Sequence, residues 1–427
     1  MCLLLIIADD FTGALDTGVQ FAACGLETRV VVDPEVDFSA CTAQVLVVDT
    51  ETRHISASAA YGIVARLTER ACRAGVRYLY KKTDSALRGN IGAELAAVLE
   101  ASGAKSLPFL PAFPQIGRIT RNGVHYVDGV PVTESPFGKD PFEPVRHASV
   151  AELIASQQAL PIRSFPPLKE GHPFPQDEGI LVFDAQDAQD LYSTGKCLLS
   201  QDHVRVMAGC AGFGAVLPEL LGIAGGAPQP VPSLDSRLLV VCGSVNPITL
   251  AQLDYAEREG FSRLRLSPRQ KLTPGYWESG EGQEDLAAIQ KLLAGHPRCI
   301  IESNDRGGNQ PTADLAEKLG LDREGLRVRI AGSLGHLVGR LFASPHLGTL
   351  LLTGGDTLLQ CMNAIGVSEL KPICELEKGV VLARFSYGHQ ARFVITKSGG
   401  FGAESLLTDL AKRMDHSQTQ PRKEAVS

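Results

Sequence analysis

The chain has 427 residues, of which 44% are hydrophobic and 21% charged, as expected for a globular protein long enough for two domains. Its formal net charge of -7 argues against a broad surface for nucleic acid or an anionic membrane. The ten cysteines are scattered, without a C-x-x-C pair or zinc-site spacing, which favours a reducing cytoplasm.

Short apolar runs alternate with helical patterns through the first half of the chain. The first run, at residues 3–7, lacks the basic flank of a signal peptide and is far shorter than a membrane span. Runs of this length suit strands that are covered on both faces of a parallel sheet. We predict strands over 3–7, 29–32, 45–48, 76–80, 107–110 and 180–183, and helices over 13–24, 57–74 and 91–102.

A long segment rich in Gly, Pro and polar residues, 111–145, interrupts this alternation. Inside it, Asn122-Gly123 and Asp128-Gly129 bracket an apolar run, which predicts a β-hairpin excursion. The segment is either a structural set of hairpin and loops or a lid over a ligand site. Residues 163–177 are rich in proline and predict an irregular loop.

A linker rich in Gly, Pro and Ser, GGAPQPVPSLDS at 225–236, precedes a second α/β series. We predict strands over 238–241, 299–301, 349–352 and 393–396, and helices over 248–259, 312–319, 334–343, 358–365 and 403–412. The fold class is therefore α/β, with two domains (1–228 and 236–414), each a mainly parallel sheet flanked by helices. The polar tail, 415–427, is expected to be disordered.

Small residues follow three predicted strands of the second half, in CGSVNPIT, TGGDT and KSGGFG. Glycine allows close backbone approach, and free N–H groups at a helix start attract phosphate. Asn246 can cap the next helix and Pro247 can occupy its first turn. Ordinary strand–helix loops are the alternative, and neither G-x-x-x-x-G-K-[ST] nor G-x-G-x-x-G occurs. Because there are three such loops, one with Asp356 and one with Lys397, the sequence supports a nucleotide site and ordinary strand–helix loops equally well.

Charged residues follow three predicted strands of the first half. Asp9 and Asp10 follow the first strand, Arg53 follows the third, and the stretch KKTDSALRGN follows Tyr80. Ligands of open α/β sheets bind outside the carboxyl ends of the strands, so these groups could converge. Cations pair with a carboxylate and Asp accepts hydrogen bonds from hydroxyls, which a polyhydroxy acid presents together. Solvated loop charges and helix-capping Asp are the alternative.

With the motifs IADDFTGALDTGVQ, KKTDSALRGNIGAE, PAFPQIGRITRNG, DGVPVTES, TGGDT and TKSGGFG in this order, the chain resembles the four-carbon acid sugar kinase family. The resemblance covers about residues 4–412. The wording of KKTDSALRGN and DPFEPV is closer to the D-threonate and D-erythronate kinase branch than to the 3-oxo-tetronate kinase branch. It implies an ATP-dependent kinase acting on the terminal hydroxyl of a short sugar acid, with the acid bound by the first domain and ATP by the second.

The resemblance also implies which residues bind. Acid contacts fall on Asp9, Arg53, Lys82, Thr83, Asp84 and Ser85, to which the same motif adds Arg88. Nucleotide contacts fall on Ser244, Gly354, Gly355, Asp356, Thr357, Gly399 and Gly400, with Lys397 just before them. The family's serine-rich turn reads GSVNPIT here, so the contacts around Asn246 stay open.

Phosphoryl transfer needs positioning and charge neutralisation, so we expect Mg²⁺ beside ATP, with metal ligands that the sequence does not identify. Asp356 is the first candidate for the proton acceptor and Asp10 the second, while Asp9 would accept hydrogen bonds from substrate hydroxyls. The expected partners are a small sugar acid and ATP, not nucleic acid or a membrane, and a homodimer is compatible with the sequence.

Three alternatives stay open. The first is a 3-oxo-tetronate kinase or another small hydroxy-acid kinase. The second is a nucleotide-independent hydrolase or aldolase that uses Asp9, Asp10 and Lys82. The third is a non-catalytic sugar-acid sensor, for which the sequence offers no DNA-binding helix pair or basic face.

Overall fold

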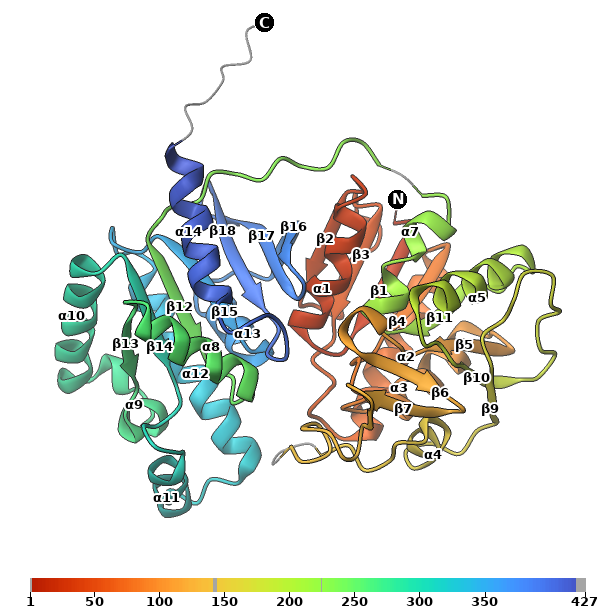
Figure 1. Ribbon diagram of the computed structural model, residues 1–427, viewed down its shortest axis with the longest axis horizontal. Coiled ribbons are helices and arrows are strands. Elements are labelled where there is room, and N and C mark those ends of the chain that lie inside the picture. Colours follow the sequence, from red (N-terminus) through yellow and green to blue (C-terminus); the bar gives the residue numbers. More distant parts are fainter. Residues whose placement is uncertain (1, 141–143, 224, 420–427) are drawn as a thin grey trace, which may run out of the picture. The chain divides into compact units, whose positions relative to one another are not determined.

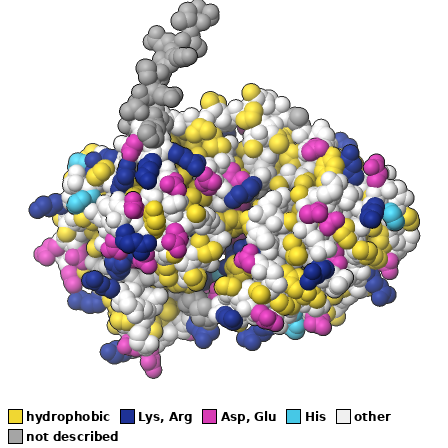
Figure 2. Space-filling model, viewed as in Figure 1, with side chains coloured by type: hydrophobic (Ala, Val, Ile, Leu, Met, Phe, Trp, Pro, Cys, Tyr) yellow, Lys and Arg dark blue, Asp and Glu magenta, His cyan; other side chains and the backbone are white. Residues whose placement is uncertain are grey.

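A computed structural model describes residues 2–140, 144–223 and 225–419 (Figure 1). The chain divides into two compact units, Met1–Gln229 and Pro230–Ser427. Figure 2 shows acidic and basic side chains interspersed over the visible face of each unit. No helix of the described residues is both long enough and apolar enough to cross a bilayer.

The first unit is built on a parallel sheet with the strand order β2-β3-β1-β4-β11-β5-β10-β9. Its central strands are apolar and fully buried, because helices cover both faces. The strands are β1 (Leu4–Ala8), β2 (Thr28–Val31), β3 (Val45–Asp49), β4 (Tyr78–Lys82), β5 (Ser106–Leu110), β9 (Ile162–Phe165), β10 (Gly179–Phe183) and β11 (Val206–Gly209).

The helices of this unit form two layers, because its crossovers run in both directions across the sheet (Figure 1). One layer contains α1 (Phe11–Ala22), α5 (Ala188–Ser200), α6 (Ala211–Gly214) and α7 (Leu217–Leu220), which pack against one another. The other contains α2 (Ala57–Arg73), α3 (Ile91–Ser102) and α4 (Val150–Ala155), with α3 between the other two.

The predicted hairpin excursion is confirmed. A small antiparallel sheet contains β6 (Arg118–Arg121), β7 (Val124–Val127) and β8 (Val130–Pro131), after the short helix η1 (Pro114–Ile116). Both tight turns place two successive residues at positive φ, 52° and 73° at Asn122-Gly123 and 50° and 84° at Asp128-Gly129. Those values are typical of the mirror-image turns that match strand twist. Residues 141–143 of the predicted segment 111–145 lie outside the described residues.

The second unit has the strand order β13-β14-β12-β15-β18-β17-β16. The pairs from β13 to β18 are parallel, while β18, β17 and β16 pair antiparallel. The strands are β12 (Leu238–Cys242), β13 (Ser262–Arg265), β14 (Arg298–Glu302), β15 (Thr349–Thr353), β16 (Glu369–Glu377), β17 (Val380–Tyr387) and β18 (Gln390–Lys397).

The helices of this unit again lie in two layers (Figure 1). The helices α8 (Pro247–Arg258) and α14 (Leu406–Thr419) pack together, so the last helix extends into the segment 415–427 that we expected to be disordered. Residues 420–427 of that segment lie outside the described residues. The other layer contains α9 (Pro268–Leu272), η2 (Tyr276–Glu278), α10 (Gly280–Gly295), α11 (Gln310–Lys318), α12 (Arg323–Leu341) and α13 (Gly355–Ala364).

The first strand of each unit occupies the same topological position. β1 lies between β3 and β4, and the helix that follows it is on the opposite layer from the helices that follow its neighbours. β12 lies between β14 and β15 in the same way. Loops diverge at such a point, so the carboxyl ends of these strands are where open α/β sheets bind ligands.

Several elements differ from the sequence prediction. β4 ends at Lys82 rather than at Tyr80, and α12 begins at Arg323, well before the predicted 334. The strand β9 runs from Ile162 into the stretch 163–177 that was predicted as an irregular loop, and β11, β13, β16, β17, α5 and α10 were not predicted. The missed strands β9, β13 and β16 carry polar residues and are not fully buried, so they lack the apolar run of a central strand. In contrast, β11 is apolar and fully buried and β17 begins with the buried run VVLA, so these two strands were missed although the signal was present.

Candidate functional site

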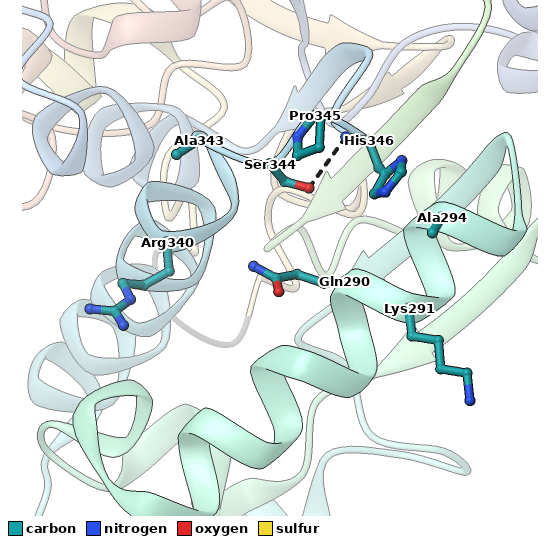
Figure 3. Close-up of a pocket in the computed structure, with 8 residues that line it drawn as sticks. All are labelled: Gln290, Lys291, Ala294, Arg340, Ala343, Ser344, Pro345 and His346. Atoms are coloured by element: carbon teal, nitrogen blue, oxygen red, sulfur yellow. Dashed lines mark hydrogen bonds between the residues drawn. The ribbon is translucent and has the colours of Figure 1, made fainter.

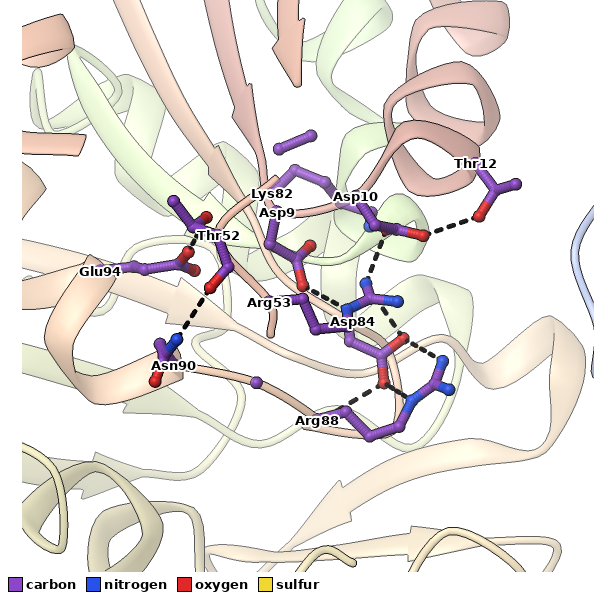
Figure 4. Close-up of polar contacts among 12 residues, drawn as sticks. Asp9, Asp10, Thr12, Thr52, Arg53, Lys82, Asp84, Arg88, Asn90 and Glu94 are labelled. Atoms are coloured by element: carbon purple, nitrogen blue, oxygen red, sulfur yellow. Dashed lines mark hydrogen bonds and ion pairs between the residues drawn. The ribbon is translucent and has the colours of Figure 1, made fainter. Parts of the chain in front are cut away.

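The carboxyl end of β1 carries two buried carboxylates that share one guanidinium (Figure 4). Arg53, which follows β3, donates from Nε to Asp9 Oδ2 at 2.7 Å and from Nη2 to Asp10 Oδ1 at 2.6 Å. Thr12, in the first turn of α1, donates its hydroxyl to the other Asp10 oxygen at 2.7 Å. Two like charges can be buried side by side because both are paired with one cation.

The loop between β4 and α3 brings a third carboxylate to the same guanidinium (Figure 4). Asp84 Oδ1 lies 3.7 Å from Arg53 Nη2 and 2.9 Å from Arg88 Nη2, and its Oδ2 accepts from Arg88 Nε at 3.0 Å. Asp84 Oδ2 also accepts the backbone N–H groups of Ala86 and Arg88, so this carboxylate fixes the turn of its own loop. We call Asp9, Asp10, Arg53, Lys82, Asp84 and Arg88 the charged cluster.

Burial disfavours the ionised carboxylates of the charged cluster, but the neighbouring cations outweigh that effect. Arg88 and Arg53 hold the pKa of Asp84 well below its ordinary value despite burial. Arg53, Lys82 and the Thr12 hydroxyl likewise lower the pKa of Asp10. The carboxylates of Asp10, Asp9 and Asp84 raise the pKa of Arg53 well above its ordinary value. Asp10, Asp84 and Arg53 are therefore ionised at neutral pH.

Lys82, the last residue of β4, contributes a buried ammonium next to α1. A methyl group at Gly13 would lie 2.4 Å from both Lys82 Nζ and Asp10 Oδ1, so glycine makes room for the two charged groups. Lys82 is only 4% exposed, yet no protein acceptor in the described residues lies within hydrogen-bond distance of its Nζ. Lys82 is therefore available to bind an external anion.

Other buried polar atoms at these strand ends also lack a hydrogen-bond partner among the described residues. They include Asp49 Oδ2 at the end of β3, Asp9 Oδ1, an acceptor, and Thr83 Oγ1, which can donate or accept. An unsatisfied buried polar group costs about 1–3 kcal/mol. Asp9 Oδ1 and Thr83 Oγ1 thus suit an external group that donates and accepts, such as a hydroxyl or a water molecule.

A buried ion pair lies beneath the charged cluster. Lys81 and Glu94 are both fully buried, with 3.1 Å between Nζ and Oε2. Lys81 Nζ also donates to the carbonyl oxygens of Ile7 at 3.1 Å and Lys82 at 2.9 Å, so it ties the end of β4 to β1. Burial raises the pKa of Glu94, and the Lys81 ammonium opposes that rise.

The same Glu94 reaches the residue that precedes Arg53 (Figure 4). Its carboxylate accepts the hydroxyl of Thr52, whose carbonyl accepts from Asn90 Nδ2 at 2.8 Å. Helix α3 and its N-cap Asn90 therefore hold both Lys81 at the end of β4 and the loop that carries Arg53. Sequence reasoning missed Lys81, Glu94, Thr52 and Asn90, although three of them lie within or beside the motif KKTDSALRGNIGAE.

In the second unit, three strand exits bring small residues together. A methyl group at Gly399 would lie 3.0 Å from Ser244 Oγ, and one at Gly354 would lie 3.7 Å from Ser244 N. Gly354 has a φ of 105°, a conformation that favours glycine. Asn246 caps α8 as predicted, accepting the Ile248 N–H at 3.0 Å. We call residues 243–246, 354–357 and 398–400 the glycine loops.

The other predicted nucleotide contacts lie in or beside the glycine loops. Gly355, Asp356 and Thr357 form the first turn of α13, and Gly400 follows Gly399 after β18. A methyl group at Gly243 would lie 2.0 Å from Thr357 Oγ1, so these two loops are in direct contact. Backbone N–H groups at the start of α13 are donors of the kind that a phosphate needs, whereas α8 begins with Pro247, which has no N–H, and its Ile248 N–H is bound by Asn246.

Lys397 is buried behind these loops. Its Nζ donates to Thr249 Oγ1 at 3.1 Å and to the carbonyl oxygens of Ser398 and Gly399 at 3.0 and 3.3 Å. Those three acceptors match the three N–H groups of an ammonium. Its contribution to a nucleotide site would therefore be to hold the shape of the 398–400 loop.

Asp356 is partly exposed and pairs with Arg327 of α12, which also binds Glu324 at 2.6 Å. This ion pair joins α12 to the first turn of α13. Paired carboxylates from Glu324 and Asp356 raise the pKa of Arg327 despite partial burial. The assignment of Asp356 as proton acceptor stays a prediction, and so does that of Asp10.

A fourth loop, after β14, reaches the glycine loops and was missed from the sequence. Asn304 donates from Nδ2 to the Ser244 carbonyl at 3.1 Å and accepts from Asn309 Nδ2 at 3.2 Å. The buried Lys271 donates to the Ser303 carbonyl at 2.9 Å and pairs with Asp305. The signal was present, since SNDRGGNQ combines small and polar residues directly after an apolar run.

A cavity of about 430 Å³ lies elsewhere in the second unit, between α10 and the segment before β15 (Figure 3). Basic side chains from Lys291, Arg340 and His346 line it. It adjoins the amino end of β15, opposite the glycine loops. None of the predicted site residues lines this cavity.

Both halves of the chain match known domain families. Residues 4–217 match a sugar-binding N-terminal domain, and residues 239–407 match a nucleotide-binding C-terminal domain. The D-threonate kinase of Salmonella typhimurium is 31% identical over 95% of this chain and 97% of its own length. The D-erythronate kinase of Heliobacterium modesticaldum is 27% identical (93% and 94% covered), and a 3-oxo-tetronate kinase of Cupriavidus necator is 26% identical (96% and 97%).

Solved structures share the fold. A Salmonella typhimurium protein described as a putative tRNA synthase aligns with a TM-score of 0.75 at 20% identity, over 96% of this chain and 99% of that one. A Haemophilus influenzae protein aligns with a TM-score of 0.65 at 20% identity over the same shares. These likenesses concern architecture alone. Because its two halves match the paired sugar-binding and nucleotide-binding domains and its relatives match over nearly their full length, the chain belongs to the four-carbon acid sugar kinase family.

Proposed function

We propose that this protein is an ATP-dependent kinase that phosphorylates the terminal hydroxyl of a four-carbon sugar acid such as D-threonate or D-erythronate. The observation that carries this proposal is the charged cluster, in which a buried lysine without a protein acceptor lies beside carboxylates. A sugar acid offers one carboxylate and several hydroxyls, which match those groups. The D-threonate and D-erythronate kinases among the relatives support the same substrate class.

The proposed division of labour follows the two units. Residues 1–228 would bind the acid, with Asp9 and Thr83 toward its hydroxyls and Lys82 toward its carboxylate. Arg53 already binds Asp9, Asp10 and Asp84, so it would act chiefly by positioning them. Residues 236–414 would bind ATP through the glycine loops, in which the first backbone N–H groups of α13 are suited to a phosphate.

Mg²⁺ would accompany ATP and supply compensating charge for the phosphates. Among the described residues no three acidic, histidine or cysteine side chains gather to hold a metal ion. That fits magnesium, which usually takes one or two carboxylates and completes its shell with phosphate oxygens and water. Asp356, at the start of α13, is the carboxylate that would serve it in the second unit.

The proton of the attacking hydroxyl needs an acceptor. Asp356 is the first candidate and Asp10 the second. The lowered pKa of Asp10 makes it a weak base, but phosphoryl transfer through a loose transition state demands little proton transfer before the bond is made. Asp10 would then orient the hydroxyl through a hydrogen bond.

The test is ADP release by the full-length protein with Mg-ATP and a panel of D-threonate, D-erythronate, L-threonate and a 3-oxo-tetronate. We expect release with at least one acid and none without an acid. A 3-oxo-tetronate as the best substrate would favour the second candidate, which the 26% identical relative supports. Product formation without ATP would indicate a hydrolase or aldolase, and acid binding without turnover a sensor.

We further propose a cytoplasmic protein, since all ten cysteines are free. A homodimer stays a prediction, which the mass in solution would test.

A further inference from the structure

The antiparallel β6–β8 sheet meets the charged cluster at one residue, Ser85. Arg118, the first residue of β6, is 5% exposed and donates from Nη1 to Ser85 Oγ. His125 of β7 is fully buried, with its Nε2 2.9 Å from the Ser85 carbonyl oxygen. The excursion therefore holds both the side chain and the backbone of Ser85.

The histidine contact defines the proton positions. The Ser85 carbonyl can only accept, so His125 Nε2 carries the proton and Nδ1 accepts from the Thr120 hydroxyl, 3.0 Å away. Burial lowers the pKa of His125 to about 4, so the ring is neutral at physiological pH. The backbone of Ser85 is thus fixed by an uncharged bridge that does not change its protonation between pH 5 and 8.

Arg118 is itself held in place by an aromatic ring. The Arg118 guanidinium lies 4.9 Å from the centroid of the Phe137 ring, and the Arg88 guanidinium lies 5.2 Å from it. Arg88 is bound in turn to Asp84 of the charged cluster. Phe137 is half-buried, and cation–π contacts are worth about 0.5–2 kcal/mol each, depending on how far they are desolvated. Phe137, Arg118 and Arg88 therefore form a wall beside the charged cluster.

The chemistry of the two partners decides the direction of the Ser85 hydroxyl. Arginine has no acceptor, so Ser85 Oγ must accept from Arg118 and its own proton must point elsewhere. Among the described residues no protein acceptor lies within hydrogen-bond distance of that proton. A hydroxyl that accepts from a cation and has a free proton is a directed donor for an anion.

We propose that Arg118 is a positioning residue that sets Ser85 as a hydrogen-bond donor to the substrate's carboxylate, and thereby favours acids over neutral polyols. This inference rests on the proposed function, because the anion is taken to be the sugar acid. The β6–β8 sheet is then a fixed wall of the acid site rather than a lid. Arg118 acts through Ser85. Without Arg118, the Ser85 hydroxyl would be free to rotate and would discriminate poorly between an acid and a neutral polyol.

The test compares Arg118→Gln, Arg118→Lys and Ser85→Ala in the full-length protein. The matched control is Arg121→Gln, since Arg121 lies on the same strand, stacks on Tyr126 at the same 4.9 Å, and is exposed. Acid binding is measured by calorimetry without ATP, and the Michaelis constants for acid and ATP are measured separately. The ratio of kcat/KM for the acid to that for the neutral four-carbon polyol gives the selectivity.

We expect Arg118→Gln to weaken acid binding about tenfold and to lower the selectivity by a similar factor, with the ATP constant unchanged. Arg118→Lys, which still only donates, should recover most of the loss. Combining Arg118→Gln with Ser85→Ala should cost no more than either alone, because both remove one interaction. Arg121→Gln should change none of these values.

Unchanged selectivity in Arg118→Gln would overturn the inference, as would equal losses for acid and polyol together with a lowered melting temperature. Additive losses in the double variant would also overturn it. If the wild type binds the acid but releases no ADP, the proposed function fails, while the calorimetric comparison of the variants still tests Arg118.

Discussion

The two units place their candidate sites at the same point of topology and fill them with opposite chemistry. In the first unit, the exits of β1, β3 and β4 carry long charged side chains that bind one another. In the second, the exits of β12, β15 and β18 carry small residues whose backbones lie against one another. The strand order provides the place, and the side chains decide what can bind there.

This difference has an energetic side. The carboxylates of Asp9, Asp10 and Asp84 can stay buried in the first unit because each is paired with a cation, so the shape of its site depends on ion pairs. The second unit depends on the absence of side chains, so its shape depends on backbone conformation, as at Gly354. Substitutions should therefore damage the two sites by different mechanisms, and each experiment below uses that contrast.

The largest effect is expected for Arg53→Gln. It leaves three buried carboxylates without their shared cation, so the free energy of unfolding should fall by about 3–5 kcal/mol. Misplacement of Asp9 and Asp10 should lower kcat/KM by more than about 10²-fold. Denaturant titration and steady-state kinetics measure both. Arg66→Gln, on an exposed position of α2, is the control. A stable, active Arg53→Gln protein would show that the carboxylates do not need this partner.

Asp356→Asn should lower turnover by about 10²-fold, as expected for a lost general base or metal ligand, while acid binding changes little. Near-normal turnover would transfer the acceptor role to Asp10 or to water. Arg327→Gln is the companion variant, because it removes only the ion pair with α12. If it reproduces the whole loss, Asp356 acts by holding α13 rather than by chemistry.

Asp9→Asn should raise the Michaelis constant for the acid about ten- to a hundredfold, since Asp9 Oδ1 is a buried acceptor for which the described residues supply no hydrogen bond. The constant for ATP should hardly change. Asp10→Asn should instead lower turnover with a smaller effect on acid affinity. Circular dichroism checks folding of both proteins. If Asp9→Asn lowers only thermal stability, Asp9 and Asp10 have a structural role and do not bind the substrate.

Two single-methyl substitutions compare the sites directly. Gly13→Ala places a methyl against Lys82 Nζ and Asp10 Oδ1 and should raise the acid constant about tenfold, with the ATP constant unchanged. Gly399→Ala places a methyl 3.0 Å from Ser244 Oγ and 3.3 Å from Asn246 Cβ and should raise the ATP constant several-fold. If either variant affects the other substrate's constant equally, the proposed division between the units is wrong.

The smallest effect concerns pH. The pKa of Asp84 is lowered on folding, so its ionised form stabilises the native state above its unfolded pKa of about 3.9, and this contribution is lost as pH falls below that value. The difference in unfolding free energy between wild type and Asp84→Asn should therefore shrink below about pH 4, by up to about 1.4 kcal/mol per pH unit. If the difference in unfolding free energy does not change with pH, the charge of Asp84 does not contribute to stability.

Most central strands could be predicted because their residues form uninterrupted apolar runs, although β11, which lies between β4 and β5, was missed. β4 shows where that signal ends. The run stops at Tyr80, yet the strand continues through Lys81 and Lys82, both of which are buried. The reason is Glu94, which lies on another element and pairs with Lys81. A partner that the fold supplies from elsewhere leaves no trace in local periodicity.

The candidate site divides in the same way. Asp9, Arg53 and Asp84 could be predicted to converge because each directly follows a strand. Their mutual pairing could not, because Arg53 was equally suited to an external carboxylate as to three internal ones. Arg118 lies in the motif PAFPQIGRITRNG and Asn304 follows β14, but both were missed because the residues that they contact, Ser85 and Ser244, come from other segments.

The shared guanidinium of Arg53 also has a consequence for how the first unit folds. Its three carboxylate partners come from the end of β1 and from the β4–α3 loop, so Arg53 binds all of them only when these two segments and its own loop after β3 have come together. Partial unfolding that releases one segment leaves the charges of the other segments without partners. This region should therefore open as a single cooperative unit in hydrogen exchange. A bound acid would add its own free energy to that unit, about 2.7 kcal/mol at a hundredfold excess over its Kd, and would slow exchange at amides of β1, β3 and β4 together.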